Sequence, residues 1–229
     1  LTQPLFQALN LPQPIELKRS PSDCLAEPRG SILIAATQHN FALSSIFKAL
    51  DTDNTTLFSA RSNGEAFSLS AAPSSHKATS KEIQLDNIGS QQFKALVFDA
   101  TGIKSSAELK QLYSVFKRSV RQIRNNGRFV IIAQTPEQSA LQGSLIGFAK
   151  SLAKESGKKG ITSNVLYLDK GAQKYLSSTL KFFVSPKSAY ITGQSITLNS
   201  KALKKNKLNN LQPLKDKTAI VTGAAQGIG

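Results

Sequence analysis

The sequence predicts an α/β domain in which helices cover both faces of a doubly wound parallel sheet, giving three layers. Short apolar runs such as residues 31–36 and 128–133 are typical of buried parallel strands. Stretches with helical spacing of apolar residues alternate with these runs along the chain. The length of 229 residues, with 40% hydrophobic content, suits one large domain with extensions.

The expected elements follow one another from residue 31 to residue 198. Strands are predicted at residues 31–36, 55–58, 82–85, 95–98, 128–133, 163–168 and 195–198, and helices at residues 41–50, 105–124, 135–156 and 173–183. The second helix has the reciprocal capping pattern of Ser105 and Glu108, and residues 125–127 mark its end. The third is expected to open with Thr135 as its cap and Gln138 three residues later.

Composition divides the chain into four parts. Residues 1–30 form a proline-rich arm, residues 31–200 the domain, residues 201–217 a linker, and residues 218–229 the first strand and glycine loop of a truncated second domain. Within the domain, residues 61–90 are rich in serine and alanine and show only weak periodicity. We therefore expect one core with extensions.

Several classes of protein are disfavoured by the residue content. No apolar run approaches the roughly 20 residues needed to cross a bilayer, and no secretory signal is visible, so we expect a soluble cytoplasmic protein. The lone Cys24 excludes an internal disulfide. His39 and His76 stand among polar neighbours and are interpreted as loop residues, so no metal is expected.

The net charge of +15 raises the question of an anionic partner. The charges recur at helical spacing in two sets, namely Lys110, Lys117, Arg121 and Arg124, and Lys150, Lys154, Lys158 and Lys159. Solvated helix faces are the simpler interpretation. An acidic protein partner is the next, ahead of nucleic acid, because no nucleic-acid-binding motif accompanies the charge.

A glycine-rich turn follows the apolar run at residues 218–221. Such a turn lets the backbone approach a pyrophosphate, which the next helix would hold by its amino-terminal amides. Residues 216–229, DKTAIVTGAAQGIG, resemble the opening of a short-chain dehydrogenase/reductase. The resemblance implies a cofactor-binding loop, incomplete here, made of Gly223, Gln226, Gly227, Ile228 and Gly229.

The upstream domain resembles a diverged copy of the same Rossmann-like fold. Residues 148–155 and 160–165 are similar to the helix and strand after the catalytic tyrosine of that family, and residues 185–194 to its last helix-to-strand turn. Two such domains behind a proline-rich arm resemble the high-molecular-weight 3-oxoacyl-[acyl-carrier-protein] reductases of bacteria. This chain would then carry their amino-terminal domain.

The resemblance also implies that the nucleotide site of this domain is degenerate. The positions of the family's serine, tyrosine, lysine and relay asparagine fall on Gln134, Gln138, Gln142 and Gln111. An amide cannot donate a proton as a phenol does, and it carries no charge. Residues 37–40 replace the glycine loop with side chains, and residues 99–102 replace an asparagine-rich turn.

The function that follows is a non-catalytic domain of an NAD(P)H-dependent β-ketoacyl thioester reductase in fatty acid metabolism. The parent would use NADPH or NADH and act on acyl carrier protein or acyl-CoA substrates, whereas this segment alone would bind neither cofactor. Gln226 stands where NADPH-preferring members often carry arginine, which leaves the choice open. The alternative is a stand-alone scaffold, dimerisation or carrier-docking module, and nucleic-acid binding rests on charge alone.

A homodimer is expected from the family resemblance, through the helices at residues 105–124 and 137–156. The second helix has an apolar stripe formed by Leu141, Leu145, Phe148 and Leu152. Burial of this stripe against the sheet of its own domain is an equally good interpretation.

Overall fold

The computed structural model describes residues 15–18, 27–37, 39–61, 77–137, 139–201 and 215–225. Residues 215–225 belong to a second compact unit and are considered by themselves. The other described residues belong to the first unit, which contains the sheet.

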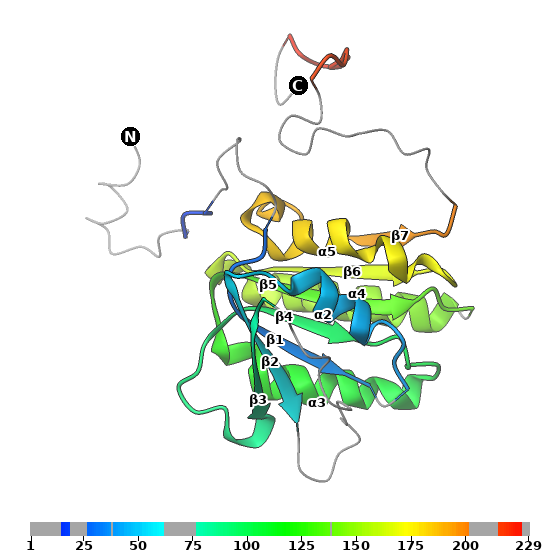
Figure 1. Cartoon of the computed structure of the whole chain (residues 1–229). Coiled ribbons are helices and arrows are strands. Elements are labelled where there is room, and N and C mark those ends of the chain that lie inside the picture. Colours follow the sequence, from blue (N-terminus) through cyan, green and yellow to red (C-terminus); the bar gives the residue numbers. More distant parts are fainter. Residues whose placement is uncertain are drawn as a thin grey trace. The chain divides into compact units, whose positions relative to one another are not determined.

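A seven-stranded parallel sheet forms the centre of the first unit, with strand order β3-β2-β1-β4-β5-β6-β7 (Figure 1). The strands are β1 (Gly30–Ala36), β2 (Thr55–Arg61), β3 (Thr79–Gln84), β4 (Phe93–Asp99), β5 (Ile123–Gln134), β6 (Thr162–Leu168) and β7 (Ser195–Leu198). The central strands each contain a buried apolar run, such as residues 95–98 in β4 and residues 129–133 in β5, because helices cover the sheet on both sides.

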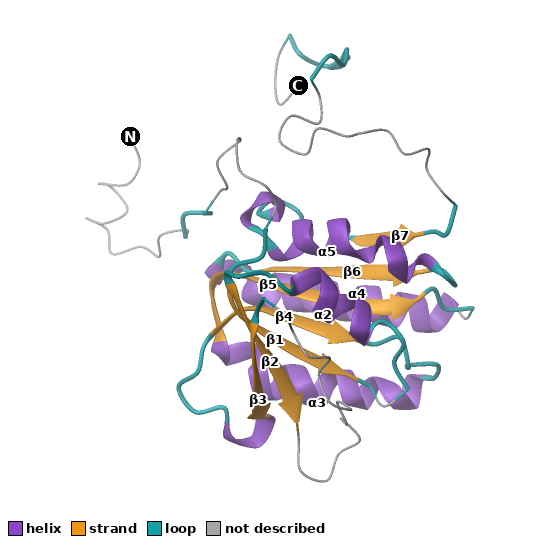
Figure 2. Ribbon diagram, in the orientation of Figure 1, coloured by secondary structure: helices purple, strands orange, loops and turns teal. Residues whose placement is uncertain are grey.

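Two pairs of helices complete the three layers (Figure 2). The helices are α2 (Leu43–Leu50), α3 (Leu109–Ser119), α4 (Ser139–Ser156) and α5 (Leu176–Val184). α2 and α5 lie side by side on one face, where Ile46 and Leu180 enter one apolar cluster. α3 and α4 cover the other face, where Phe116 and Leu145 enter a second cluster. The predicted fold class is confirmed.

Short 3-10 helices, η1 to η6, connect several of these elements. They are η1 (Leu85–Asn87), η2 (Ser106–Glu108), η3 (Val120–Gln122), η4 (Gly157–Lys159), η5 (Ala172–Tyr175) and η6 (Pro186–Ser188). The capping box predicted for Ser105 and Glu108 is present at the start of η2, which leads into α3. None of the described helices is long and apolar enough to cross a membrane.

The end of α3 differs from the prediction. The helix ends at Ser119, whose hydroxyl donates a 2.7 Å hydrogen bond to the Val115 carbonyl, and the 3-10 turn η3 follows it. Residues 125–127 lie instead inside β5, where the register against β4 shifts. Gly127 is required there because a Cβ atom would lie 2.8 Å from the Arg124 carbonyl oxygen. The turn-forming residues therefore mark a bulge.

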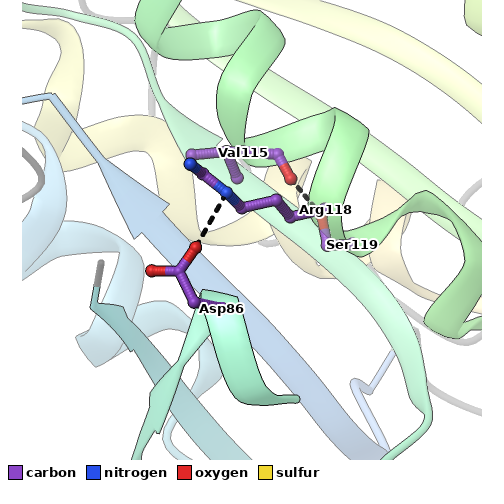
Figure 3. Close-up of polar contacts among 4 residues, drawn as sticks. All are labelled: Asp86, Val115, Arg118 and Ser119. Atoms are coloured by element: carbon purple, nitrogen blue, oxygen red, sulfur yellow. Dashed lines mark hydrogen bonds and ion pairs between the residues drawn. The ribbon is translucent and has the colours of Figure 1, made fainter. Parts of the chain in front are cut away.

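One ion pair joins α3 to the turn after β3 (Figure 3). Arg118 Nε lies 3.1 Å from Asp86 Oδ1, and both side chains are substantially exposed. Exposed pairs of this kind contribute about 0 to 1 kcal/mol, so the contact orients η1 more than it stabilises the fold.

The predicted opening of α4 at Thr135 is wrong. α4 begins at Ser139, and the Thr135 hydroxyl donates a 2.7 Å hydrogen bond to Asp169 Oδ1 in the loop after β6. The Thr135 N–H also bonds to the Leu168 carbonyl. These two bonds tie Thr135 to the neighbouring strand end, which removes it from the helix. Gln138 lies outside the described residues.

Residues 218–221 do not form the predicted strand. Among residues 215–225 no β pairing occurs, and Ile220 and Val221 have 91% and 63% of their surface exposed. An apolar run becomes a strand only when a neighbouring strand accepts its hydrogen bonds. Gly223 adopts the left-handed conformation expected of a glycine turn, with φ of 70°.

Part of the predicted arm lies against the domain. The side chain of Asn126 donates to the Glu16 carbonyl at 3.2 Å and accepts from the Lys18 N–H at 3.3 Å. Ile15 and Leu17 approach Gly160, which adopts a φ of 65°. Cys24 and most of the arm lie outside the described residues, as do most of residues 201–217 and His76.

The apolar stripe of α4 serves the core of its own domain. Leu141, Leu145 and Leu152 are buried, and Phe148 stacks edge-on against Phe116 of α3 with ring centroids 5.2 Å apart. The stripe was expected either at a dimer interface or in the core, and the structure supports the core. The basic residues of both helix sets are exposed, as expected of solvated faces.

We expect Leu145→Glu to unfold the domain, because a carboxylate would be buried without a partner at a side chain only 1% exposed. Ser144→Glu, at the adjacent exposed position, is the matched control and should keep the native circular dichroism and melting transition. A folded Leu145→Glu variant that elutes as a smaller species would show that this stripe is an intermolecular interface.

Candidate functional site

The carboxyl ends of β1 and β4 define the candidate site. These strands are neighbours, but the chain leaves β1 toward β2 and leaves β4 toward β5, in opposite directions. In open α/β sheets, ligands bind in the crevice at this switch point. The loops at residues 37–42 and 100–105 therefore decide what the site can hold.

A buried carboxylate occupies the centre of this crevice. Asp99 ends β4 with no exposed surface, and its Oδ2 accepts a 3.1 Å hydrogen bond from the Ala42 N–H. The Leu43 N–H, at the start of α2, also bonds to this carboxylate. Its Oδ1 accepts from the Thr101 N–H at 3.0 Å and from the Thr101 hydroxyl at 2.6 Å. The side chain of Asp99 thus takes the anion position at the helix amino terminus.

A second set of bonds closes the two loops on each other. The Thr37 hydroxyl donates to the Asp99 carbonyl at 3.3 Å and accepts from the Gly102 N–H at 3.2 Å. The Phe41 N–H donates to Thr101 Oγ1 at 3.0 Å. A Cβ atom on Gly102 would lie 2.5 Å from Thr37 Oγ1 and 2.8 Å from the carbonyl oxygen of residue 39. The loops are in direct contact here.

These features do not fit a dinucleotide pyrophosphate. Burial raises the pKa of Asp99 to about 6, although hydrogen bonds from Thr101, Ala42 and Leu43 oppose the rise. The group is therefore an anion at neutral pH. A pyrophosphate would need the same amides and would meet a like charge at short range.

The predicted positions of the lost catalytic groups fall at the same edge of the sheet. Gln134 ends β5 and is exposed, and Gln142 lies in the first turn of α4, where its carbonyl accepts from the Tyr167 hydroxyl at 3.0 Å. Gln111 lies in the first turn of α3, and its Oε1 is buried with no hydrogen-bond partner in the described part of the chain. Gln138 lies outside it. No hydrogen bond joins any two of the three described glutamines.

The remaining predicted positions are only partly described. Gln226, Gly227, Ile228 and Gly229 lie outside the described residues, and Gly223 belongs to the separate unit. His39 is exposed in the loop after β1. Within the described ranges, no three histidine, cysteine or acidic side chains gather as a metal site would require.

Sequence reasoning identified residues 99–102 only as an altered turn and missed the role of Asp99. The available signal was an acidic residue placed directly after the apolar strand residues 95–98. Acidic side chains are rarely buried unless their oxygens are bonded, so this position calls for nearby donors. Thr101 supplies two of those donors, and the amino terminus of α2, more than 50 residues away, supplies the others.

Comparison with known structures shows the fold of the short-chain dehydrogenase/reductases. A dehydrogenase/reductase from Sinorhizobium meliloti 1021 superposes with a TM-score of 0.59 at 14% identity, covering 78% of this chain and 96% of the other. A short-chain dehydrogenase/reductase from Serratia marcescens gives 0.56 at 12%, covering 77% and 98%. A blue fluorescent protein from a metagenomic library, in complex with NADPH, gives 0.56 at 13%, covering 75% and 97%.

The likeness at these identities concerns the fold. No protein-family model matches the chain, and no curated protein matches its sequence.

We expect Asp99→Asn to flatten the pH dependence of stability. In the native protein the folded pKa of about 6 exceeds the ordinary value of 3.8, so the folded state holds the proton more tightly. The free energy of unfolding should therefore fall by about 2 kcal/mol as pH rises from 4 to 6. Urea unfolding at a series of pH values measures this slope.

The neutral amide of the variant has no proton to lose in this range. The absolute stability of Asp99→Asn is a poor measure of the titration, because the amide nitrogen would face one of the backbone N–H donors and lower the stability for another reason. Asp53→Asn, at an exposed turn position, serves as the control and should retain the native slope. An unchanged slope in Asp99→Asn would contradict the assignment of this titration to Asp99.

Proposed function

We propose that this chain is a non-catalytic Rossmann-like domain of an NAD(P)H-dependent 3-oxoacyl-[acyl-carrier-protein] reductase, acting in fatty acid metabolism. The observation that carries the proposal is the carboxylate of Asp99 at the amino terminus of α2, where a cofactor pyrophosphate would bind. The domain keeps the frame of a reductase, and its own side chains fill the nucleotide position.

The chemistry of the surrounding residues supports the same proposal. Gln111, Gln134 and Gln142 provide amides at the edge where the family resemblance places an acid, a cation and their supporting groups. An amide can orient a carbonyl, but it cannot supply the proton or the charge. Reduction of a β-ketoacyl thioester to a β-hydroxyacyl product would belong to a second domain. Gly223, Gln226, Gly227, Ile228 and Gly229 resemble the cofactor loop of such a domain.

The alternative proposal is a scaffold or carrier-docking module that works without a reductase domain. Both proposals place the protein in the cytoplasm, and only the reductase proposal requires NADPH or NADH and a Y-x-x-x-K motif in the coding sequence after Gly229. Finding that motif would decide between them.

We expect the 229-residue chain to show no micromolar binding of NADPH or NADH in a calorimetric titration. The physical reason is the repulsion by Asp99 and the contact between the loops at residues 37–42 and 100–105. The longer parent protein should bind one of the two cofactors and reduce acetoacetyl thioesters of acyl carrier protein or coenzyme A. Loss of a proton donor alone lowers rates by roughly 10² to 10⁴. Turnover by the 229-residue chain would overturn the proposal.

We also propose a homodimer, through the outward faces of α3 and α4. The exposed side of α4 carries Gly143, Gly147 and Ser151 at intervals of four residues, and a Cβ atom on either glycine would meet no atom within 4 Å. Small residues at this spacing let two helices approach closely.

Gly147→Arg should split such a dimer and leave the monomer folded, because glycine is a poor helix residue and the site is open. Light scattering gives the mass, and circular dichroism checks the fold. Lys154→Ala, at an exposed position nearer the end of the helix, should leave the mass unchanged. A native chain that is monomeric at high concentration would rule out the dimer.

A further inference from the structure

A buried guanidinium lies at the amino edge of the sheet, opposite to the Asp99 loops. Arg128 of β5 is only 2% exposed, and its Nη1 donates to the carbonyls of Asn126 at 2.9 Å and Gly127 at 2.8 Å. Its Nε donates to the Ser185 carbonyl at 3.2 Å. No carboxylate contacts this guanidinium in the described part of the chain. Three carbonyl dipoles hold it in place.

The side chain of Lys94 provides a second cation near Arg128. Lys94 precedes Ala95 of β4, which pairs with Arg128 across the sheet, and its Cδ lies 3.9 Å from the position of a Cβ atom on Gly30. The side chain of Lys94 is half-buried, and within the described residues its ammonium makes neither a hydrogen bond nor an ion pair. Burial, and then the charges of Arg128, Arg29 and Lys18, lower the pKa of Lys94.

Two further cations extend this group to the surface. Arg29 is exposed immediately before β1, and Lys18 is exposed on the arm segment at residues 15–18 that Asn126 holds. A cavity of about 510 Å³ is lined by Glu16, Leu17, Lys18 and Tyr190. The positive charge therefore extends from the exposed Arg29 and Lys18 to the buried Arg128.

This arrangement is unfavourable without an anion. A buried cation with no counter-charge destabilises a protein by several kcal/mol, and like charges nearby add to that. The three carbonyls around Arg128 offset part of this energy. Glu16 is the nearest acid along the arm segment, and it makes no ion pair with these cations in the described structure.

We propose that Lys94, Arg29 and Lys18 bind the phosphate group of a phosphorylated small molecule, and that the charge of the buried Arg128 supports this site from within the sheet. The exposed Arg29 guanidinium offers planar, paired donors and the Lys94 ammonium offers a compact charge, and this combination suits a tetrahedral oxyanion. The limited exposure of Lys94 and Arg128 favours a single small group over an extended polyanion. The site is independent of the proposed reductase role, because it lies at the other edge of the sheet.

The test is thermal unfolding of the 229-residue chain in inorganic phosphate, at constant ionic strength with sodium chloride. A dissociation constant near 1 mM predicts a rise in Tm of roughly 4 °C at 20 mM phosphate. Lys94→Gln should remove this rise while the domain stays folded, because it also relieves repulsion. Lys110→Gln changes an exposed lysine in the first turn of α3, at the carboxyl edge of the sheet, and should retain the rise in Tm. Arg128→Met should behave like Lys94→Gln if it folds.

Glycerol phosphate in place of inorganic phosphate distinguishes a monoester site from a site for the free ion. A rise with either compound that Lys94→Gln abolishes supports the proposal. Equal rises in the native chain, Lys94→Gln and Lys110→Gln would show a general salt effect and overturn it. No rise in the native chain would also overturn it, leaving Arg128 as a brace for the Ser185 carbonyl.

Discussion

The buried carboxylate of Asp99 is the interaction on which the carboxyl edge of this domain depends. It joins the last residue of β4 to the amino terminus of α2, and so it fixes the two loops that diverge from the switch point. In a nucleotide-binding domain the bound ligand makes this connection. In this domain the chain's own residues make that connection, so the loops at the carboxyl edge are joined without a ligand.

The fold itself depends on apolar packing of the sheet and helices. A strand order of 3-2-1-4-5-6-7 and helices on both faces require only apolar packing, which the two core clusters supply. Glutamines at residues 111, 134 and 142 are therefore compatible with the same architecture.

The elements that were predicted correctly are those that hydrophobic periodicity and capping residues determine. Strands such as β1 and β7, and the capping box at Ser105, were found because their signals are local. The end of α3 and the start of α4 were misplaced because tertiary partners decided them, namely the register of β4 with β5 and the Thr135 bond to Asp169. The bonds from Phe41 and Ala42 join residues about 60 apart, so the acidic residue after the strand signals a buried carboxylate but not these partners.

The contact of residues 16–18 with Asn126 has a consequence for the order of folding. Its hydrogen bonds span 108 and 110 residues of sequence, yet once β1 and β5 are in place the arm is tethered by only the short stretch before Gly30. The loss of loop-closure entropy that remains is then small. We therefore expect the contact with Asn126 to form late and to open separately from the core. The segment at residues 15–18 should therefore detach and rebind without unfolding of the domain, and hydrogen exchange of the Lys18 N–H would report this local step.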